Sequence, residues 1–272
     1  MAGRRARGAR QSSPRSQHFL RTAQLAAELV RDAEIGPRDL VVEIGAGRGR
    51  LTEELARRAG HVVAIEIDPM LVRALHGRWE NVDVVVGDAT TIGLPTDPFR
   101  VVSNIPFHRT TDLMHALLDD PSGALVRADL IVQWDVAVKR ALPWPSTLNG
   151  IVWSAFWEAS LARRLPRAAF SPRPIVDAGV LVLRRRAIPL VELTAAAAYR
   201  RFVAAGFRKG LGHVAGARRR SGSTSGRIAR DLDAHEWASL FIEATRAGRD
   251  RKRSARPGVS PSWPRDGGRG WG

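Results

Sequence analysis

The sequence contains no cysteine, which excludes a disulfide-stabilised fold, a thiolate nucleophile and any metal or iron–sulfur site with cysteine ligands. It also lacks a hydrophobic run of the ~18 residues needed to span a bilayer. The arginine-rich first 17 residues contain no hydrophobic segment of the kind found in secretory signals. These absences predict a soluble protein of a reducing compartment, and we expect it in the cytoplasm without a membrane partner.

Lysine is scarce as well, since it occurs only at positions 139, 209 and 252, so arginine carries almost all of the positive charge. The formal net charge is nevertheless +16, and the sequence pI is about 11.6. We attribute part of the arginine excess to a GC-rich coding sequence, because alanine and glycine are abundant too. The remainder favours a polyanionic partner, with nucleic acid before membrane.

The positive charge is concentrated at the two ends of the chain. Residues 1–15 contain five arginines and no acid, and residues 246–272 contain eight basic residues against two acids. Both segments are rich in glycine, serine and proline, and Pro257, Pro261 and Pro264 disfavour a helix near the end. We therefore expect a disordered basic arm over 1–15 and a disordered Arg/Gly-rich tail over 246–272. They either contact RNA phosphates without base specificity or act only as solvated tails.

Short hydrophobic runs alternate with amphipathic stretches through the first half of the chain. We expect strands over 40–44, 61–67, 82–86, 100–103 and 130–134, and helices over 22–32, 51–59, 69–79 and 111–118. Asp68 is the expected N-cap of the third helix. This alternation is typical of a parallel sheet covered by helices on both faces, so the predicted fold class is α/β, with a Rossmann-like doubly wound sheet.

The second half has a different pattern. Strands are expected over 151–157 and 178–183, where they would end the sheet in antiparallel fashion, and helices over 190–207 and 234–246. A boundary near Arg186 divides a catalytic domain over 16–186 from a small helical domain over 187–245. About 60 residues is little for independent stability, so we expect the helical domain to pack on the sheet domain.

A glycine-rich turn joins the first strand to the next helix. It reads Gly45-Ala46-Gly47-Arg48-Gly49 and follows an acid, Glu43. The dinucleotide-binding pattern Gly-x-Gly-x-x-Gly is not met, because position 50 is arginine. The spacing Gly-x-Gly-x-Gly instead resembles the first motif of class I methyltransferases, which bind S-adenosylmethionine, although a plain strand–helix turn with spare glycines remains the alternative.

Two further carboxylates follow successive strands. Glu66 ends the second strand, where a carboxylate accepts hydrogen bonds from both ribose hydroxyls of a nucleotide, and Asp88 follows the third, where it would accept from the adenine amine. Each acid alone is more often a helix cap or a surface charge. Together with the glycine turn they line one crevice at the carboxyl ends of the strands, which is where doubly wound sheets bind ligands.

The fourth strand ends in Asn104-Ile105-Pro106-Phe107, which resembles the signature of amino-methyltransferases. An exocyclic aryl amine is a weak nucleophile, because its lone pair is delocalised into the ring. The Asn104 amide oxygen and the Ile105 or Pro106 carbonyl could accept its two N–H bonds and aim the lone pair at a methyl donor, while Phe107 stacks on the extruded base. The alternative is a buried phenylalanine after a proline turn.

The motifs together are similar to the rRNA adenine N6-methyltransferase superfamily, in order and at family spacing over about 16–245. The matching segments are SQHFL (16–20), EIGAGRG (43–49), IEID (65–68), GDA (87–89), NIPF (104–107) and SPRPIVDAGVLVL (171–183). NIPFHRTTDL, VQWDVAVKRA and the tail look like the actinobacterial Erm enzymes. This resemblance implies a methyltransferase that uses S-adenosylmethionine to modify one adenine of 23S rRNA and confers macrolide–lincosamide–streptogramin B resistance.

The resemblance also implies roles for individual residues. Those implied to bind the cofactor are His18, Leu20, Gly45, Gly47, Glu66, Asp88 and Asn104. Members of the family often have asparagine in place of His18. At this cofactor-binding position the sequence therefore departs from the family pattern. Asn104, Ile105, Pro106 and Phe107 are the implied catalytic residues, and the small helical domain is implied to help hold RNA.

Two alternatives remain open at this point. One keeps the enzyme but moves the target to small-subunit rRNA, where the sibling branch dimethylates adenines, or to DNA. The other is a non-enzymatic nucleic-acid-binding factor on the same fold. An intact Asn104–Phe107 tetrapeptide disfavours the second, because a protein that only binds has no need to orient an amine.

Sequence signals for RNA contacts and for metal sites are weaker. Candidates for phosphate contact are Arg109, Lys139, Arg140, Arg163, Arg164 and the run 184–186, although ordinary solvated positions explain each equally well. The tryptophans at 134, 144, 153 and 157 are expected to pack in the core rather than stack on bases. The seven histidines lack metal-ligand spacing and no serine triad is evident, so we expect no metal. The predicted partner is 23S rRNA, protein-free or pre-ribosomal, bound by a monomer.

Overall fold

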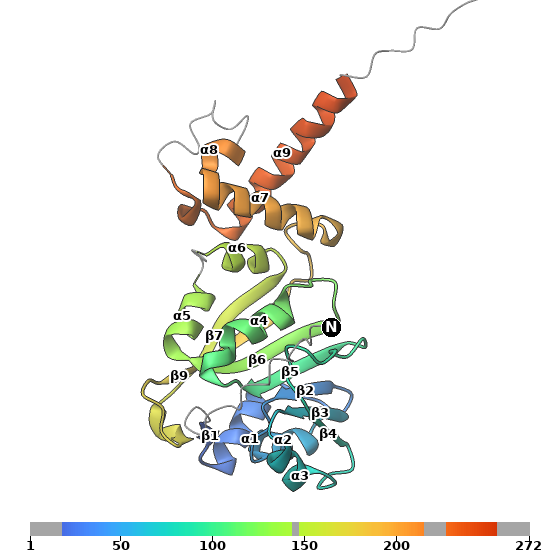
Figure 1. Cartoon of the computed structure of the whole chain (residues 1–272), viewed down its shortest axis with the longest axis vertical. Coiled ribbons are helices and arrows are strands. Elements are labelled where there is room, and N and C mark those ends of the chain that lie inside the picture. Colours follow the sequence, from blue (N-terminus) through green and yellow to red (C-terminus); the bar gives the residue numbers. More distant parts are fainter. Residues whose placement is uncertain (1–17, 143–146, 215–226, 255–272) are drawn as a thin grey trace, which may run out of the picture.

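Strands from the whole length of the catalytic region form one central sheet (Figure 1). The computed structural model describes residues 18–142, 147–214 and 227–254, so the predicted arm over 1–15 and most of the predicted tail lie outside the described residues. In the described part, the sheet has seven strands in the order β4-β3-β2-β5-β6-β9-β7. Their bounds are β2 Leu40–Ile44, β3 His61–Glu66, β4 Val82–Val86, β5 Phe99–Asn104, β6 Leu125–Gln133, β7 Trp157–Leu165 and β9 Ala178–Arg185.

Strands β2 to β6 run parallel, and β9 and β7 add an antiparallel end, as the sequence predicts. Successive residues of a strand point to opposite faces. Val41 and Val42 are both fully buried, but they join different hydrophobic clusters. The sheet is therefore covered on both sides, which explains why its strands read as unbroken hydrophobic runs.

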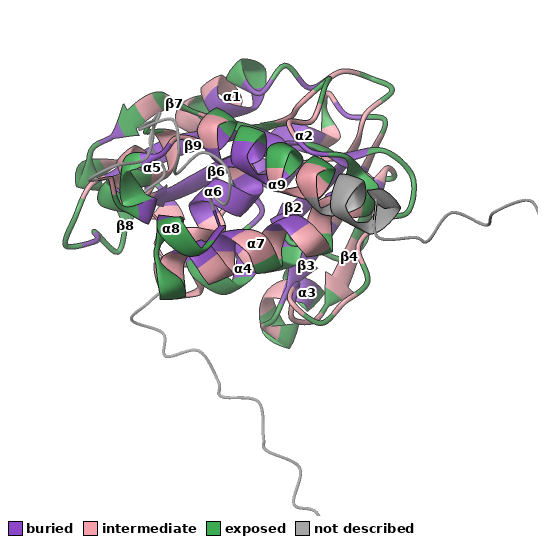
Figure 2. Cartoon of the chain, turned by 90° about the horizontal axis from the view of Figure 1, so that it is seen from above, coloured by how far each residue is buried: buried purple, intermediate pink, exposed green. Residues whose placement is uncertain are grey.

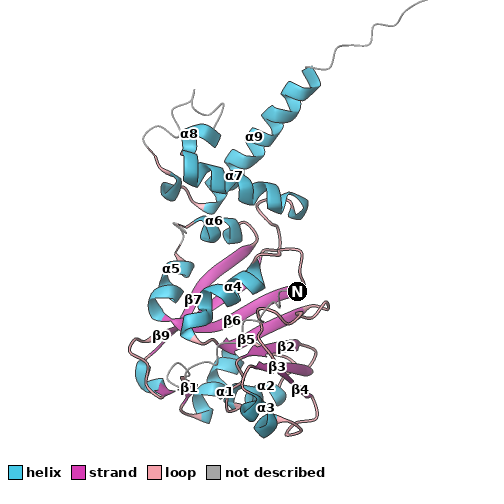
Figure 3. Cartoon of the chain, in the orientation of Figure 1, coloured by secondary structure: helices cyan, strands magenta, loops and turns pink. Residues whose placement is uncertain are grey.

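Helices connect the strands and cover these two faces (Figure 3). Those of the sheet region are α1 Ala23–Asp32, α2 Arg50–Ala56, α3 Pro69–Leu75, α4 Thr110–Leu118, α5 Trp134–Ala141 and α6 Leu148–Ser154, and the helical region that follows the last strand contains α7 Ala196–Lys209, α8 Leu211–Val214 and α9 Ala234–Ser254. Asp68 caps α3, as predicted, because its side chain accepts a hydrogen bond from the Met70 amide at 2.8 Å. Within the described residues, no helix is both long enough and apolar enough to cross a bilayer.

Two expectations for the region before β9 are wrong. The run 151–157 is not a strand, because Leu148–Ser154 forms α6 and the strand begins only at Trp157. The Thr147 side chain caps this helix by accepting from the Gly150 amide at 3.1 Å, and Ile151, Val152 and Trp153 are buried. A short run buried on all sides has no period that separates helix from strand. Helix α5 was not predicted at all.

The helical region packs on the sheet region through α6 (Figure 1). Tyr199 and Trp237 are fully buried between α7 and α9, and their hydrophobic cluster is continuous with the side chains under β5 and β6. Figure 2 shows the buried residues along the strands and the inner helix faces.

The last helix, α9, extends to Ser254, so the first part of the predicted tail over 246–272 is helical rather than disordered.

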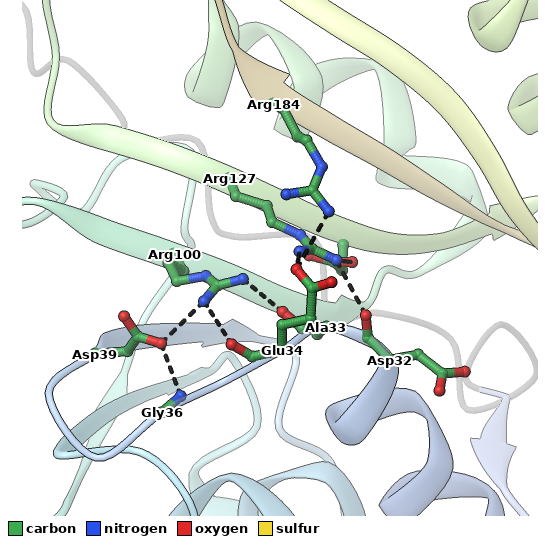
Figure 4. A network of polar contacts seen from close by, with 9 residues as sticks. Asp32, Ala33, Glu34, Gly36, Asp39, Arg100, Arg127 and Arg184 are labelled. Atoms are coloured by element: carbon green, nitrogen blue, oxygen red, sulfur yellow. Dashed lines mark hydrogen bonds and ion pairs between the residues drawn. The ribbon is translucent and has the colours of Figure 1, made fainter. Parts of the chain in front are cut away.

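Buried arginines hold the end of α1 to the amino-terminal edge of the sheet (Figure 4). The Arg127 side chain is 5% exposed and its Nε lies 2.7 Å from Asp129 Oδ2, while its Nη1 lies 2.5 Å from Glu34 Oε2. Arg100 donates to the Ala33 carbonyl at 2.5 Å. This network joins the end of α1 to the first residues of β5 and β6. It lies at the opposite edge of the sheet from the glycine turn, so it stabilises the fold rather than forming a site.

Candidate active site at the carboxyl ends of the strands

A cavity of about 640 Å³ opens at the carboxyl ends of β2, β3, β4 and β5. Its position is the crevice that the sequence predicts. The lining residues are His18, Phe19, Ile44, Gly45, Gly47, Ile65, Glu66, Ile67, Gly87, Asp88, Ala89, Asn104, Ile105, Pro106, Phe107, His108, Arg109, Asp112 and Leu113. It therefore contains every predicted cofactor-binding and catalytic residue except Leu20.

The glycine turn between β2 and α2 needs its glycines for conformation and for space. Gly45, Gly47 and Gly49 have φ angles of 77°, 57° and 80°, a region that side chains other than glycine rarely adopt. A Cβ on Gly47 would also lie 2.7 Å from the ring of Phe19. The turn thus needs glycine for its conformation at all three positions, and it makes a tight contact with the N-terminal segment beside Gly47.

Glu66 is held in one orientation by backbone amides. Its Oε2 accepts from the Gly47 amide at 2.8 Å, and its Oε1 accepts from the amides of Ile67 and Asp68 at 2.9 and 3.0 Å. A carboxylate offers about four acceptor positions, so the described residues leave one, on Oε2. Glu66 therefore has an acceptor position on Oε2 for a further donor, and its expected contact with a ribose remains a prediction.

Asp88 follows β4 and is fixed from two sides. Its Oδ1 accepts from the amide and the hydroxyl of Thr90 at 2.9 and 2.7 Å, and Arg109 Nη2 lies 2.9 Å from its Oδ2. Partial burial raises the pKa of Asp88, but the hydrogen bonds from Thr90 and Arg109 outweigh it and hold the pKa below its usual value. Asp88 is therefore ionised at neutral pH and can accept a hydrogen bond from an amine.

Glu43 lies in β2, two residues before the glycine turn, and its protonation state could not be predicted from the sequence. The residue is 2% exposed, and its Oε2 accepts from the Thr52 hydroxyl at 2.6 Å. Burial raises the pKa of Glu43 to about 8, the bond from Thr52 opposes this shift, and the charge of Glu66 adds to it. At neutral pH Glu43 is therefore predominantly a neutral carboxylic acid under the turn.

Asn104, the last residue of β5, has its side-chain amide oriented by the N-terminal segment. Its Nδ2 donates to the His18 carbonyl at 2.6 Å. This bond directs the amide nitrogen toward His18 and leaves Oδ1 without a partner among the described residues. The Pro106 carbonyl already accepts from the Arg109 amide at 2.8 Å. Of the two carbonyls considered from the sequence, that of Ile105 is therefore the more available acceptor.

Aromatic rings surround the tetrapeptide. The ring of Phe107 lies 5.5 Å from the His18 ring and 6.5 Å from that of Phe170. His18 Nδ1 is also 2.9 Å from the Pro172 carbonyl, so the N-terminal segment is attached to the chain just before β9. Phe107 is half-buried beside the cavity, where one face can receive a further ring.

Leu20 does not lie in this cavity. The short strand β1, Phe19–Leu20, pairs with β8, Phe170–Ser171, and its two side chains point to opposite sides. Leu20 is 4% exposed and packs in the core, whereas Phe19 lines the cavity. Leu20 instead lines, with Gly45 and Asn104, a small second hollow beside the main cavity, whereas Phe19, which sequence reasoning missed, borders both.

Two of the arginines predicted to contact RNA lie on the edge strand β7 and bind other parts of the fold. Arg163 Nη2 lies 2.7 Å from Glu28 Oε2 of α1, and Arg164 Nη2 lies 2.8 Å from Asp177 Oδ2. The Arg164 guanidinium also covers the Trp134 ring at 4.7 Å. The two side chains lie on opposite faces of the sheet, so they do not form one surface.

The other basic candidates are scattered as well. Arg140 lies 5.1 Å from the centre of the Trp153 ring, and burial lowers the pKa of its guanidinium. Lys139 is exposed and has no acidic partner among the described residues. The run 184–186 is bound to the fold by ion pairs and backbone carbonyls. Trp153 and Trp157 are buried, as predicted, and Trp144 lies outside the described residues.

Three exposed arginines beside the cavity were missed. Arg48 lies 4.8 Å from the centre of the Phe19 ring, and Arg50 lines, with Arg48 and Asn104, a small second hollow next to the main cavity. Arg78 stacks on Trp79 at 4.6 Å, close to Gly49. None of the three has an acidic partner in the described part of the chain. The signal was present in the sequence, since Arg48 and Arg50 flank Gly49.

The cavity fits S-adenosylmethionine by the chemistry of its walls. Gly45 and Gly87 line it, and Ile44, Ile65 and Ala89 offer an apolar surface to a nucleoside. The two fixed carboxylates offer acceptors for hydroxyl and amine groups. Across the described residues, no group of three or more histidines or acids could hold a metal ion.

The chain is similar to known rRNA methyltransferases. The model of the family described as ribosomal RNA adenine dimethylase matches residues 10–213. The ribosomal RNA small subunit methyltransferase A of Moorella thermoacetica is 37% identical over 218 residues, covering 72% of this chain and 74% of the relative. The mycinamicin-resistance protein MyrB of Micromonospora griseorubida is 34% identical over 251 residues, covering 85% and 79%.

Among solved structures, the 23S rRNA methyltransferase ErmE superposes with a TM-score of 0.71 at 29% sequence identity, covering 84% of this chain and 99% of that chain. These matches confirm the predicted fold class and the resemblance on which the cofactor was expected. The chain belongs to the ribosomal RNA adenine dimethylase family and is an rRNA adenine N6-methyltransferase that uses S-adenosylmethionine.

Proposed function

We propose that the protein methylates N6 of one adenine in 23S rRNA and so confers resistance to macrolide, lincosamide and streptogramin B antibiotics. The observation that carries this proposal is the similarity to MyrB, a mycinamicin-resistance protein, over 85% of this chain. The likeness to ErmE, a 23S rRNA methyltransferase, supports the same substrate. The protein would act in the cytoplasm, as a monomer, on protein-free or pre-ribosomal RNA.

In this proposal Asn104 and Ile105 orient the target amine. The Asn104 Oδ1, turned into the cavity by the bond from Nδ2 to the His18 carbonyl, accepts one N–H of the adenine amine. The Ile105 carbonyl accepts the other. Two acceptors on the hydrogens favour a pyramidal nitrogen whose lone pair points toward the methyl donor. The rate gain then comes from orientation and from fixed dipoles, with no metal-ligand cluster required.

Phe107 supplies the surface on which the adenine rests. Its ring is supported by His18 at 5.5 Å and by Phe170 at 6.5 Å, so it is held in place before a base arrives. A base that leaves its helix or loop loses its stacking partners, and an aromatic ring replaces them. Pro106 restricts the backbone between the amine acceptors and this ring, which keeps their spacing fixed.

The cofactor is assigned to the part of the cavity under the glycine turn. S-adenosylmethionine supplies an activated methyl group when it is bound. Gly45 and Gly47 line the space for its amino-acid portion, Glu66 accepts from the ribose, and Asp88 accepts from the adenine amine. Because backbone amides and Thr90 hold both carboxylates, these acceptors need no rearrangement when the nucleoside enters. His18 borders the same space from the N-terminal side.

RNA would approach across the cationic side of the cavity mouth. Arg48 and Arg50 line the small hollow that Asn104 also lines, Arg78 lies near Gly49, and all three are exposed and free of acidic partners among the described residues. They can therefore neutralise phosphates beside the target nucleotide, which supplies affinity without base specificity. Lys139 remains a more distant candidate for the same role. The basic segments 1–15 and 246–272 would add to this attraction.

Small-subunit rRNA is the second candidate substrate. The 37% identity to a small-subunit methyltransferase of Moorella thermoacetica favours it, because this relative is as similar to the chain as MyrB. The two candidates differ only in the RNA, so the substrate must be measured directly.

The test incubates purified protein with a labelled methyl donor and separate protein-free large-subunit and small-subunit rRNA. Label in the large-subunit RNA, a primer-extension stop at one adenine, and a rise in erythromycin tolerance of a sensitive host that expresses the gene are the expected results. The inactive Asn104→Ala variant is the matched control for the host experiment. Label confined to small-subunit RNA, with no change in tolerance, would transfer the assignment to the second candidate.

A further inference from the structure

Arg109 is the cationic residue closest to the cofactor part of the cavity, and it does not face RNA in the way the sequence suggested. It ends the short 3₁₀ turn Phe107–Arg109, which directly precedes α4. Its Nη2 lies 2.9 Å from Asp88 Oδ2, 3.1 Å from Asp88 Oδ1 and 3.3 Å from Thr90 Oγ1. Its Nε lies 3.4 Å from Asp112 Oδ2. The guanidinium therefore spans two carboxylates inside the cavity.

The charges beside the guanidinium disfavour a phosphate, although only its Nη2 makes hydrogen bonds to the described residues. The Arg109 side chain is 28% exposed, and the two acids beside it carry one negative charge more than it neutralises. A phosphate bound at this position would meet the negative charges of Asp88 and Asp112 in a partly buried site. The geometry thus disfavours Arg109 as an RNA contact, and another role has to explain a paired arginine in the cofactor cavity.

The bonds at Asp88 divide its two oxygens. Oδ1 accepts from the amide and the hydroxyl of Thr90 and from Arg109, which fills its acceptor positions. Oδ2 accepts only from Arg109, so one of its positions stays available on a carboxylate that cannot rotate. An ionised oxygen with one open position accepts a hydrogen bond from an N–H group, whereas it repels a carbonyl oxygen.

We propose that Arg109 is a positioning residue that holds Asp88 with Oδ2 open to the adenine amine of the cofactor, and that it thereby sets the preference for adenine over deaminated purine. The inference rests on the proposed assignment of Asp88 to adenine. Arg109 also connects the cofactor to the reaction centre, since its backbone amide donates to the Pro106 carbonyl at 2.8 Å. The same residue thus fixes the shape of the tetrapeptide turn and the acceptor of the cofactor.

The experiment measures binding without RNA, by titration calorimetry with S-adenosylhomocysteine and with S-inosylhomocysteine, in which a carbonyl replaces the amine. The variants are Arg109→Met, which removes the guanidinium, and Arg109→Lys, which keeps the charge but not the paired donors. Arg38→Met is the matched control, because Arg38 is an exposed arginine before β2, at the opposite edge of the sheet.

We expect Arg109→Met to weaken S-adenosylhomocysteine binding about tenfold, since one hydrogen bond to a charged group is worth about ten- to a hundredfold in affinity. Binding of S-inosylhomocysteine should change less than about threefold, so the preference for adenine shrinks, and Arg109→Lys should lie between wild type and Arg109→Met. RNA retention in a gel-shift assay and its salt dependence should match those of Arg38→Met.

Three results would overturn the inference. Unchanged S-adenosylhomocysteine affinity would mean that Asp88 needs no support, and tighter binding would mean that Arg109 occupies the place of the amine. An equal loss for both ligands would indicate a general disturbance of the cavity, and the second ligand therefore also serves as the folding control. If wild type itself bound neither ligand, the assignment of the cavity, rather than the role of Arg109, would be wrong.

Discussion

Replacing Glu43 by glutamine should change how the stability of the protein depends on pH. Burial raises the pKa of Glu43 to about 8 in the folded chain, against an ordinary value of 4.5. Between these values, the folded protein holds one proton more than the unfolded chain at this position. The free energy of unfolding therefore falls by about 1.4 kcal/mol for each pH unit in this interval.

The sign follows from the raised pKa. The contribution of neutral Glu43 is fully present below about pH 4.5 and is lost as the pH rises through about 8. From about pH 5.5 to 7.5, the loss amounts to about 3 kcal/mol, which is a large part of the stability of a typical domain. Glutamine has the same shape and can still bond to the Thr52 hydroxyl, but it does not titrate.

Urea unfolding of both proteins without ligand, at about pH 5.5, 6.5 and 7.5, measures the effect. The free energy of unfolding of Glu43→Gln relative to wild type should rise by about 3 kcal/mol across this range. Glu53→Gln, on the same helix as Thr52 but with a side chain 40% exposed, is the matched control for the substitution itself. If the free energy of unfolding of Glu43→Gln relative to wild type changes by less than about 0.5 kcal/mol across this range, Glu43 is not a buried neutral acid.

Three further predictions concern the reaction, the fold and the RNA. Asn104→Ala should lower methyl transfer by at least ~100-fold while S-adenosylhomocysteine affinity stays within about tenfold, because the lost amide acts on the amine; near wild-type turnover would contradict this role. Arg127→Met should cost about 3–5 kcal/mol in urea unfolding, because it leaves Asp129 buried without its partner, whereas Arg184→Met, with a side chain 49% exposed, should cost about 1 kcal/mol or less. Deleting residues 1–15 should weaken RNA binding most at low salt and flatten its salt dependence, and a salt-independent loss would point to shape-specific contacts instead.

The sequence predicted four of the parallel strands well, because each is a short, mainly hydrophobic run bounded by turn signals, whereas β6 begins at Leu125 rather than at the expected residue 130. Leu40–Ile44 and Val82–Val86 lie where expected, and the glycine turn and the tetrapeptide follow their strands. Residues at the carboxyl ends of parallel strands meet at one edge by geometry alone. For that reason Gly45, Glu66, Asp88 and Asn104 could be placed in one cavity before any coordinates.

The same reasoning failed where local pattern does not decide. The apolar run near Ile151 forms a helix, because Thr147 caps it and α7 covers it, and neither partner is visible in the run itself. Arg163 and Arg164 looked like free cations, but they meet Glu28 and Asp177, which lie 135 and 13 residues away in sequence. The partner of a charge is a property of the folded chain.

What the sequence by itself determined is the class of chemistry: a glycine turn, two acids after successive strands, and an amide followed by an aromatic ring are local features with fixed spacing. What only the tertiary structure decided is the state of these groups. It places the Asn104 amide against the N-terminal segment, pairs Arg109 with Asp88, and buries Glu43 so that its pKa is raised to about 8. Spacing along the chain fixes which groups can meet, whereas burial and partners distant in sequence fix their charge and direction, and these arise only when the chain is folded.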